Sequence, residues 1–221
     1  MDIEQLRWGF LQLILLIISI GLHEFGHAWM ADLRGDPLPR MQGRVTLNPF
    51  AHADPIGTIA IPAVAIFFPI LFHLKWKLLL IGWGKPVQIS LPNPKTRRMD
   101  DIYITLAGPA MNLILCGAFA VIGGLGHFDL GSQKLIGEFL HMGIILNAGL
   151  VVFNLIPIPP LDGSRVALRL GLYTEETFLS LAQWGFVILI VLVNLEPVQV
   201  AMNYLKWLVV WPCFQLWSLL A

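Results

Sequence analysis

The sequence predicts an all-α protein that crosses a membrane several times. Of its 221 residues, 57% are hydrophobic and only 13% are charged, whereas soluble domains carry about 25% charged residues. The mean hydropathy of +0.73 agrees with this composition. Apolar runs of about 20 residues, the length a helix needs to cross the hydrocarbon core, recur along the chain. We therefore expect about five full spans and one re-entrant or hairpin apolar segment, with short β-strands near the functional site, in a single domain over residues 1–221.

Five apolar segments have the length and composition of full spans. The last two, which we group as closing spans over about 174–219, are separated by the dipeptide Glu196-Pro197. Proline is tolerated in the first turn of a helix but not in its interior, so a new helix is expected to begin there. The five predicted spans cover residues 8–30, 102–125, 138–156, 176–195 and 198–219.

The apolar stretch 56–83 does not fit a full span. Pro62 and Pro69 interrupt it, and Lys75 and Lys77 lie between its apolar parts. Two crossings need about 20 residues each, which is more than this stretch offers. A re-entrant hairpin is therefore predicted. In the polar segments around it, weak alternation over 43–48 and over 85–90 favours short β-strands.

The segment His23-Glu24-Phe25-Gly26-His27, near the end of the first span, carries the strongest chemical signal. On a helix, the two histidines are one turn apart and share a face, so both can bind one metal ion. Glu24 is then placed to accept a proton from a metal-bound water. A charged residue within an apolar span is costly and indicates a function. We therefore expect a metal-dependent hydrolytic site within the membrane.

Asp162 is the candidate for a third protein ligand, which a catalytic zinc site usually has. It follows a segment in which Pro157, Pro159 and Pro160 prevent a regular helix. Such backbone survives at membrane depth only when it is buried in protein or lines a water-filled cavity. A hydrolase needs that environment. The alternative is an Asp-Gly turn at the membrane surface.

The topology of the chain follows from this pairing. Asp162 can meet the histidines only if residues 31–101 begin and end on one side of the membrane, which also favours the hairpin over 56–83. Most lysines and arginines lie in segments on that side. The positive-inside rule then places the site towards the cytoplasm. The N-terminus would lie outside and, after two closing spans, the C-terminus inside.

Four sequence blocks resemble the site-2 protease family, whose members are zinc metalloproteases that cleave within membranes. Together they fall between residues 20 and 166. The chain is most similar to the short bacterial members, without a PDZ or CBS domain. The blocks are His-Glu-Phe-Gly-His at 23–27, Asn-Pro-Phe-Ala-His-Ala-Asp-Pro at 48–55, Ala-Gly-Pro-Ala-Met-Asn at 107–112, and the segment from Phe153-Asn154 to Leu161-Asp162-Gly163.

The resemblance implies one Zn²⁺ per chain, bound by His23, His27 and Asp162, with Glu24 as the catalytic base. It also implies a catalytic core over about 8–166, transmembrane proteins as substrates, and a multi-pass location in the bacterial inner membrane.

Asparagines in two of the blocks are further candidates. The resemblance implies that Asn154 helps to hold the substrate or the developing oxyanion. Asn112 is the asparagine of the Gly-Pro-x-x-Asn block and is a candidate to support a ligand or to contact substrate.

His52 and Asp54 admit two interpretations. They could support the metal site, contact substrate or form an alternative pair of metal ligands, but capping of the turns around Pro49 and Pro55 explains them as well. Gly108, by contrast, is expected to permit close helix packing.

A non-proteolytic zinc carrier, sensor or scaffold is the alternative function. It is less favoured because the polar groups gather at one level of the membrane and because Glu24 stands between the two histidines. The net charge of zero, without a basic stripe, excludes a nucleic-acid partner. No feature of the sequence selects an oligomeric state.

Overall fold

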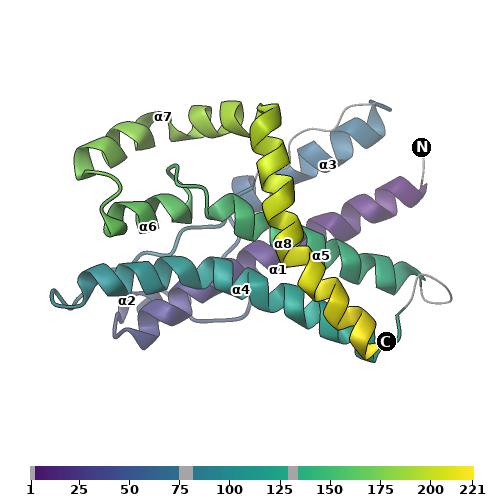
Figure 1. Cartoon of the computed structure of the whole chain (residues 1–221), viewed down its shortest axis with the longest axis horizontal. Helices are drawn as coiled ribbons and strands as arrows, with labels where there is room; N and C mark the ends of the chain where they lie inside the picture. Colours follow the sequence, from purple (N-terminus) through teal and green to yellow (C-terminus); the bar gives the residue numbers. More distant parts are fainter. Residues whose placement is uncertain (1–2, 75–81, 129–133) are drawn as a thin grey trace.

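The computed structural model describes residues 3–74, 82–128 and 134–221, and they form helices joined by turns and extended segments (Figure 1). The all-α prediction agrees with this architecture, and the five predicted spans each correspond to one long helix. The long helices are α1 (Ile3–Leu33), α4 (Arg97–Leu125), α5 (Lys134–Asn154), α7 (Glu175–Asn194) and α8 (Glu196–Leu220). The short helices are α2 (Leu38–Met41), the 3₁₀ turn η1 (Pro49–Ala51), the π-helical η2 (Pro55–Ala60), α3 (Ile61–Leu71) and α6 (Asp162–Leu170).

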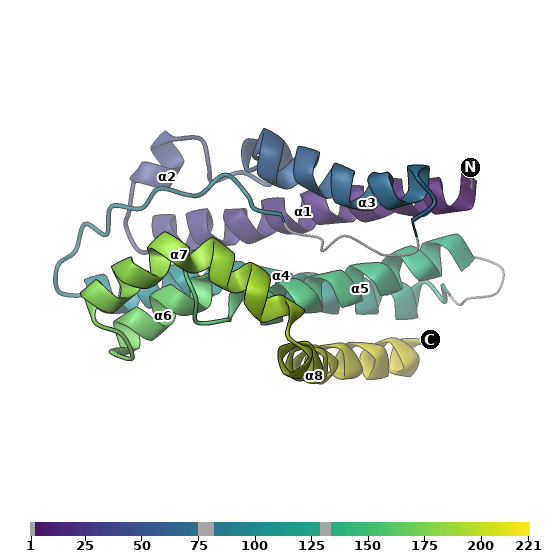
Figure 2. The same ribbon diagram turned by 90° about the horizontal axis from the view of Figure 1, so that it is seen from above.

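Helices α1, α4 and α5 form the centre of the molecule and run side by side along its long axis (Figures 1 and 2). Small residues let them approach closely, as is usual in membranes. A Cβ atom on Gly26 of α1 would lie 2.5 Å from the carbonyl oxygen of Ala107 on α4, and one on Gly143 of α5 would lie 2.7 Å from the ring of Phe119. This packing fixes the ends of the three helices relative to one another.

Four of the described helices are long and apolar enough to cross a membrane, namely α1, α4, α5 and α7. The structure therefore supports an integral membrane protein. Helix α8 is long enough, but it does not meet the same criterion of hydropathy. Its first half carries Glu196, Gln199, Asn203 and Lys206. The predicted number of five full spans is thus not reproduced.

The closing helices differ from the predicted pair of full crossings. Helix α7 starts beside α6 and ends near the middle of the molecule, and α8 continues from there to the end where α4 terminates (Figure 1). A Cβ atom on Gly123 of α4 would lie 2.1 Å from the ring of Trp217, so α8 is packed tightly against that end. Leu220, the last residue of α8, therefore lies beside the end of α4, opposite to Asp162. The prediction that the C-terminus lies on the same side as Asp162 is wrong.

The stretch 56–83 folds as the hairpin prediction requires in the part the structure describes. Helix α3 runs beside α1 (Figure 2). Trp83 lies again at the level where the stretch starts, because its N–H donates to the Gly57 carbonyl at 3.1 Å. Lys75 and Lys77, at the predicted tip, lie outside the described residues.

The two predicted β-strands do not form. Residues 43–48 are turns and bends, and residues 85–90 are extended without a partner strand. One isolated antiparallel bridge joins Ala53 and Gly84. Two short segments would make at best a marginal sheet. Side chains rather than a second strand satisfy the ends of the extended segment.

Candidate active site

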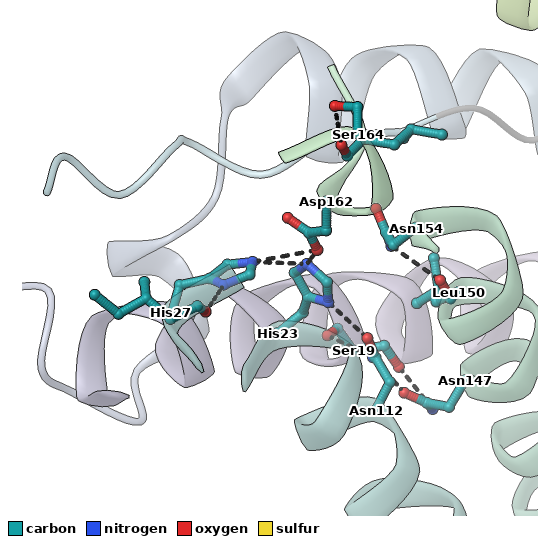
Figure 3. Close-up of polar contacts among 11 residues, drawn as sticks. Ser19, His23, His27, Asn112, Asn147, Leu150, Asn154, Asp162 and Ser164 are labelled. Atoms are coloured by element: carbon teal, nitrogen blue, oxygen red, sulfur yellow. Dashed lines mark hydrogen bonds and ion pairs between the residues drawn. The ribbon is translucent and has the colours of Figure 1, made fainter. Parts of the chain in front are cut away.

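The two histidines of the first motif point from α1 into the middle of the helix bundle (Figure 3). His23 is buried, His27 is nearly so, and their Nε2 atoms lie 3.1 Å apart. The helical spacing of four residues produces this arrangement, as the sequence predicts. One ion placed between the two rings would contact both nitrogens.

Asp162 reaches the same point from the first residue of α6. Its Oδ2 atom lies 3.2 Å from His23 Nε2 and 3.5 Å from His27 Nε2 (Figure 3). The preceding segment is irregular, and the Ser164 hydroxyl fixes its last turn by donating to the Leu161 carbonyl at 2.6 Å. The structure thus brings together the three residues that the sequence predicts as metal ligands.

The three ligand atoms suit a tetrahedral metal ion. Metal–ligand bonds of about 2.0–2.1 Å put tetrahedral ligand atoms about 3.3 Å apart, and the observed separations are 3.1, 3.2 and 3.5 Å. Asp162 Oδ2 is buried and has no hydrogen-bond partner among the described residues. Buried polar atoms nearly always have a partner, so a cation at this point would supply the one that is missing.

Hydrogen bonds on the far side of each ring leave the two Nε2 atoms suited to bind a metal. His27 Nδ1 lies 2.7 Å from the Ile104 carbonyl, and His23 Nδ1 lies 2.7 Å from Asn112 Oδ1. A carbonyl oxygen only accepts, so His27 carries its proton on Nδ1 and presents the Nε2 lone pair. Such outer hydrogen bonds orient metal-binding imidazoles.

Gly108 allows α4 to pass directly behind the two rings. A Cβ atom there would lie 2.4 Å from His27 Nε2 and 2.7 Å from His23 Cε1. No larger residue fits without moving a ring, so the predicted packing role of Gly108 bears directly on the site.

Glu24 and Asn154 line a cavity of about 430 Å³ that is also lined by His23, His27 and Asp162. The Glu24 side chain lies against the backbone of Gly84, where a Cβ atom would be 2.6 Å from Glu24 Cγ. Asn154 stands at the end of α5, and its amide donates to the Leu150 carbonyl at 3.0 Å (Figure 3). Both residues therefore face the space in which a substrate would lie.

The extended segment 84–91 forms part of the cavity wall and is held at its ends. The guanidinium of Arg44 donates to the carbonyls of Lys85 and Pro86. At the other end, buried Asp36 accepts hydrogen bonds from the backbone and hydroxyl of Ser90 at 2.5 and 2.7 Å. Burial opposes the negative charge of Asp36, but its hydrogen bonds outweigh burial and lower its pKa below the ordinary value.

His52 and Asp54 lie outside the group of three converging residues. Asp54 caps η2, because its carboxylate accepts from the N–H groups of Ile56 at 3.0 Å and Gly57 at 2.6 Å. His52 is fully buried in the loop, and burial lowers its pKa while its Nε2 contacts the Thr46 carbonyl at 2.9 Å. For Asp54, the contacts favour the capping interpretation.

Some polar residues at the site have no counterpart among the predicted residues. Ser19 and Asn147 are fully buried behind His23. Asp101 is also buried, and it binds Arg165 at 2.7 Å and Arg169 at 2.5 Å, which joins α6 to α4. The signal for Ser19 and Asn147 was present in the sequence. Ser19 precedes His23 by four residues and Asn147 precedes Asn154 by seven, spacings that keep each pair on one helix face.

Comparison with known proteins yields relatives that are each named putative zinc metalloprotease. Putative zinc metalloprotease YwhC of Bacillus subtilis is 36% identical over 190 residues, covering 81% of this chain and 78% of the relative. Putative zinc metalloprotease Rip2 is 31% identical in Mycolicibacterium smegmatis and 28% in Mycobacterium tuberculosis. The matches to Rip2 cover 80% of this chain and 63% of each relative, slightly less than two thirds. No family profile and no solved structure matches the chain.

Proposed function

This chain belongs to the zinc metalloprotease family that includes YwhC, and we propose that it is an intramembrane zinc endopeptidase of the site-2 protease type. It would hydrolyse peptide bonds in or near the transmembrane segments of other membrane proteins. The observation that carries this proposal is the convergence of His23, His27 and Asp162 beside Glu24, inside a bundle of apolar helices.

In this proposal, one Zn²⁺ is bound by the three converging residues and supplies Lewis acidity and a water of lowered pKa. Glu24 faces the same cavity. It accepts a proton from the attacking water and later delivers it to the leaving amine. The amide of Asn154, at the cavity wall, can turn from the Leu150 carbonyl to donate to the developing oxyanion.

A second cavity, of about 820 Å³, supports a transmembrane substrate. It lies among α1, α5, α7 and α8, and it shares Gly82, Leu150 and Phe153 with the active-site cavity. Its wall is mostly apolar, as an apolar helix entering from lipid requires. We propose that the substrate span lies here while its scissile bond reaches the metal site.

The extended wall offers a partner for an unwound substrate. A peptide bond within a helix is shielded by its own hydrogen bonds, so the substrate must adopt an extended form near the site. The backbone N–H groups of Val87, Gln88 and Ile89 have no hydrogen-bond partner in the described part of the chain. They can pair with a substrate segment in the manner of an added strand.

The charge distribution supports an active-site end that faces the cytoplasm of a bacterial cell. Arg34, Arg40, Arg165 and Arg169 lie near this end, at the C-terminus of α1, in α2 and in α6. Loops rich in arginine and lysine usually stay on the cytoplasmic side. The named relatives come from bacteria, which supports the inner membrane as the location.

Cleavage of a panel of single-span substrates by purified protein in lipid tests the proposal. Wild type is compared with Glu24→Gln, and the zinc content of both is measured. We expect about one zinc in each protein, because Glu24 is not a ligand. The turnover of Glu24→Gln should be lower by about 10²–10⁴-fold, the usual contribution of a general base.

Other outcomes separate the alternatives. Zinc in both proteins without cleavage of any substrate would favour the carrier, sensor or scaffold. Absence of zinc from both would show that the ligand assignment is wrong. Asp54→Ala serves as a control, because Asp54 caps η2 instead of facing the cavity.

A further inference from the structure

A chain of buried amide and hydroxyl groups extends from His23 away from the cavity (Figure 3). Asn112 on α4 donates from Nδ2 to Asn147 Oδ1 on α5 at 2.8 Å. Asn147 in turn donates from Nδ2 to the hydroxyl of Ser19 on α1 at 3.0 Å. All three side chains are fully buried. Uncharged polar groups at this depth need a reason, and the proposed chemistry does not use them.

Two backbone carbonyls fix the direction of every hydrogen bond in this chain. The Ser19 carbonyl lies 3.3 Å from the Asn112 amide and can only accept, so the NH₂ group of Asn112 must face it. The Gly143 carbonyl, at 2.9 Å, fixes the NH₂ group of Asn147 in the same way. The oxygen of Asn112 is therefore left to face His23 Nδ1, at 2.7 Å.

This direction determines the tautomer of His23. Because the Asn112 oxygen only accepts, His23 must carry its proton on Nδ1, and Nε2 is left with a free lone pair. That lone pair points at the position between His27 and Asp162. For His27, the backbone carbonyl of Ile104 accepts from Nδ1 and determines the tautomer. The tautomer of His23 thus depends on side chains, and that of His27 does not.

We propose that Asn147 and Ser19 are positioning residues that act through Asn112 to hold His23 ready to bind the metal. The proposal rests on the proposed function in one respect, namely that His23 is a zinc ligand. It adds two residues that contact neither the metal nor the substrate.

Zinc affinity, measured by competition with a chelator on purified protein in lipid, tests the proposal. We expect Asn112→Ala to lower zinc affinity by about 10- to 100-fold and Asn147→Leu by about 10-fold, the range seen when the partner of a metal-binding histidine is removed. The double variant should bind zinc no more weakly than Asn112→Ala alone, because Asn147 acts through Asn112. Independent, additive losses would overturn the proposal.

Asn194→Leu is the matched control. Asn194 makes the same helix-internal bond as Asn147, to the carbonyl four residues earlier at 2.7 Å, but it is exposed on α7. Its replacement should leave zinc affinity unchanged. An equal loss of zinc affinity in Asn194→Leu would show that replacing any such asparagine by leucine weakens zinc binding, whatever its position.

A second pair of variants covers the case in which Asn147→Leu does not fold. Ser19→Ala removes one hydroxyl and should lower zinc affinity less than Asn147→Leu does, whereas Ser19→Thr keeps the hydroxyl and should restore the affinity. Nitrogen-15 NMR of His23 should show protonated Nδ1 in wild type and a mixture of tautomers in Asn112→Ala, which removes the acceptor of the Nδ1 proton. Unchanged zinc affinity in Ser19→Ala, which leaves one N–H of Asn147 without its acceptor, would overturn the proposal.

The cleavage assay tests the proposed function, and the zinc-affinity measurements test the positioning residues. Wild type that binds zinc but cuts no substrate would contradict the protease assignment, while the differences in zinc affinity between wild type and variants would still decide the roles of Asn147 and Ser19.

Discussion

The helices on the two sides of the active-site cavity differ in how much of their apolar length is buried within the protein. On the side that carries the proposed metal-binding residues, which we call the firm side, 44% of the apolar stretch of α1, 39% of that of α4 and 44% of that of α5 are buried within the protein. On the other side, only 17% of the apolar stretch of α7 is buried. Phe186 of α7 reaches the cavity and contacts the ring of Trp83 at 5.8 Å between centroids.

The difference in burial indicates that one side of the cavity serves metal binding and the other side serves substrate entry. Metal binding requires ligand atoms held within a few tenths of an ångström, and closely packed helices provide that rigidity. Admission of a substrate helix requires elements that open at low cost, and these have few buried contacts. Small changes in packing on the firm side should therefore alter zinc affinity. Changes in the shape of the cavity on the loosely held side should alter the cleavage of substrate.

The largest effect is expected on the firm side, from Gly108→Ala. The added methyl group would lie 2.4 Å from His27 Nε2. His27 must move, so zinc affinity should fall by about 100-fold, comparable to the most severe loss of a supporting hydrogen bond. Gly117→Ala, on the same helix, is the control, because a Cβ atom there meets nothing within 4 Å. Equal zinc affinity in both variants would contradict the close fit.

A smaller effect is expected from filling the second cavity with Gly149→Leu. Gly149 lines the cavity, and a Cβ atom added there meets nothing within 4 Å, so a leucine at this position would reduce the cavity. Displacement of one apolar side chain of the substrate costs about 1.5–3 kcal/mol, which lowers kcat/KM by about 10- to 100-fold. Zinc content should not change. Cleavage at the wild-type rate, with Gly117→Leu as control, would show that substrate does not use this cavity.

A smaller effect again is expected from Asp36→Asn, which loosens one end of the wall at 84–91. An amide cannot accept all the hydrogen bonds that the carboxylate accepts, and each donor left buried without a partner costs about 1–3 kcal/mol. Hydrogen exchange at Ser90 and Leu91 should become faster, cleavage should slow, and zinc affinity should not change. A fall in zinc affinity would mean that the two sides of the cavity are not independent.

The same carboxylate predicts the direction of a pH effect. The pKa of Asp36 is lowered in the folded protein, so its stabilising contribution is present above its unfolded pKa of about 3.9. It is lost as the pH falls through the lower folded value. Protection of the Ser90 amide, corrected for intrinsic exchange, should therefore decrease only in acid. Constant protection down to the lowest tolerated pH would contradict this account.

The smallest effect is expected from Asp54→Ala. Loss of a helix cap costs about 1 kcal/mol of stability, and Asp54 lies outside the cavity lining. Thermal unfolding should show a modest loss, with cleavage and zinc affinity close to wild type. A large loss of activity in a folded variant would revive a direct role for Asp54 at the site.

The sequence predicted the firm side better than the loosely held side. Hydrophobic length predicts the positions of the long helices, and the spacing of His23 and His27, with the prolines before Asp162, predicts the three residues that converge in the structure. These signals are local or follow from the cost of polar groups in lipid.

The predictions that differ from the structure concern segments whose conformation depends on contacts between residues far apart in the sequence. Alternation over 43–48 and 85–90 indicated strands, but Arg44 and Asp36 satisfy the backbone around 85–91 in place of a sheet. Length alone predicts two full crossings for the closing helices, because it does not show that Trp217 packs on Gly123. The helical spacing of Asn147 and Asn154 indicates a shared face, but one asparagine in an apolar span does not reveal its partners on other helices.

The most direct test of the central claim is to map the bond that the protein cuts. A single-span substrate is incubated in lipid vesicles with wild type or Glu24→Gln, and the product ends are identified by mass spectrometry. The account predicts a cut inside the apolar segment or at its edge, only with wild type and only with zinc present. Cleavage confined to loops well outside the membrane, or equal cleavage by Glu24→Gln, would contradict it.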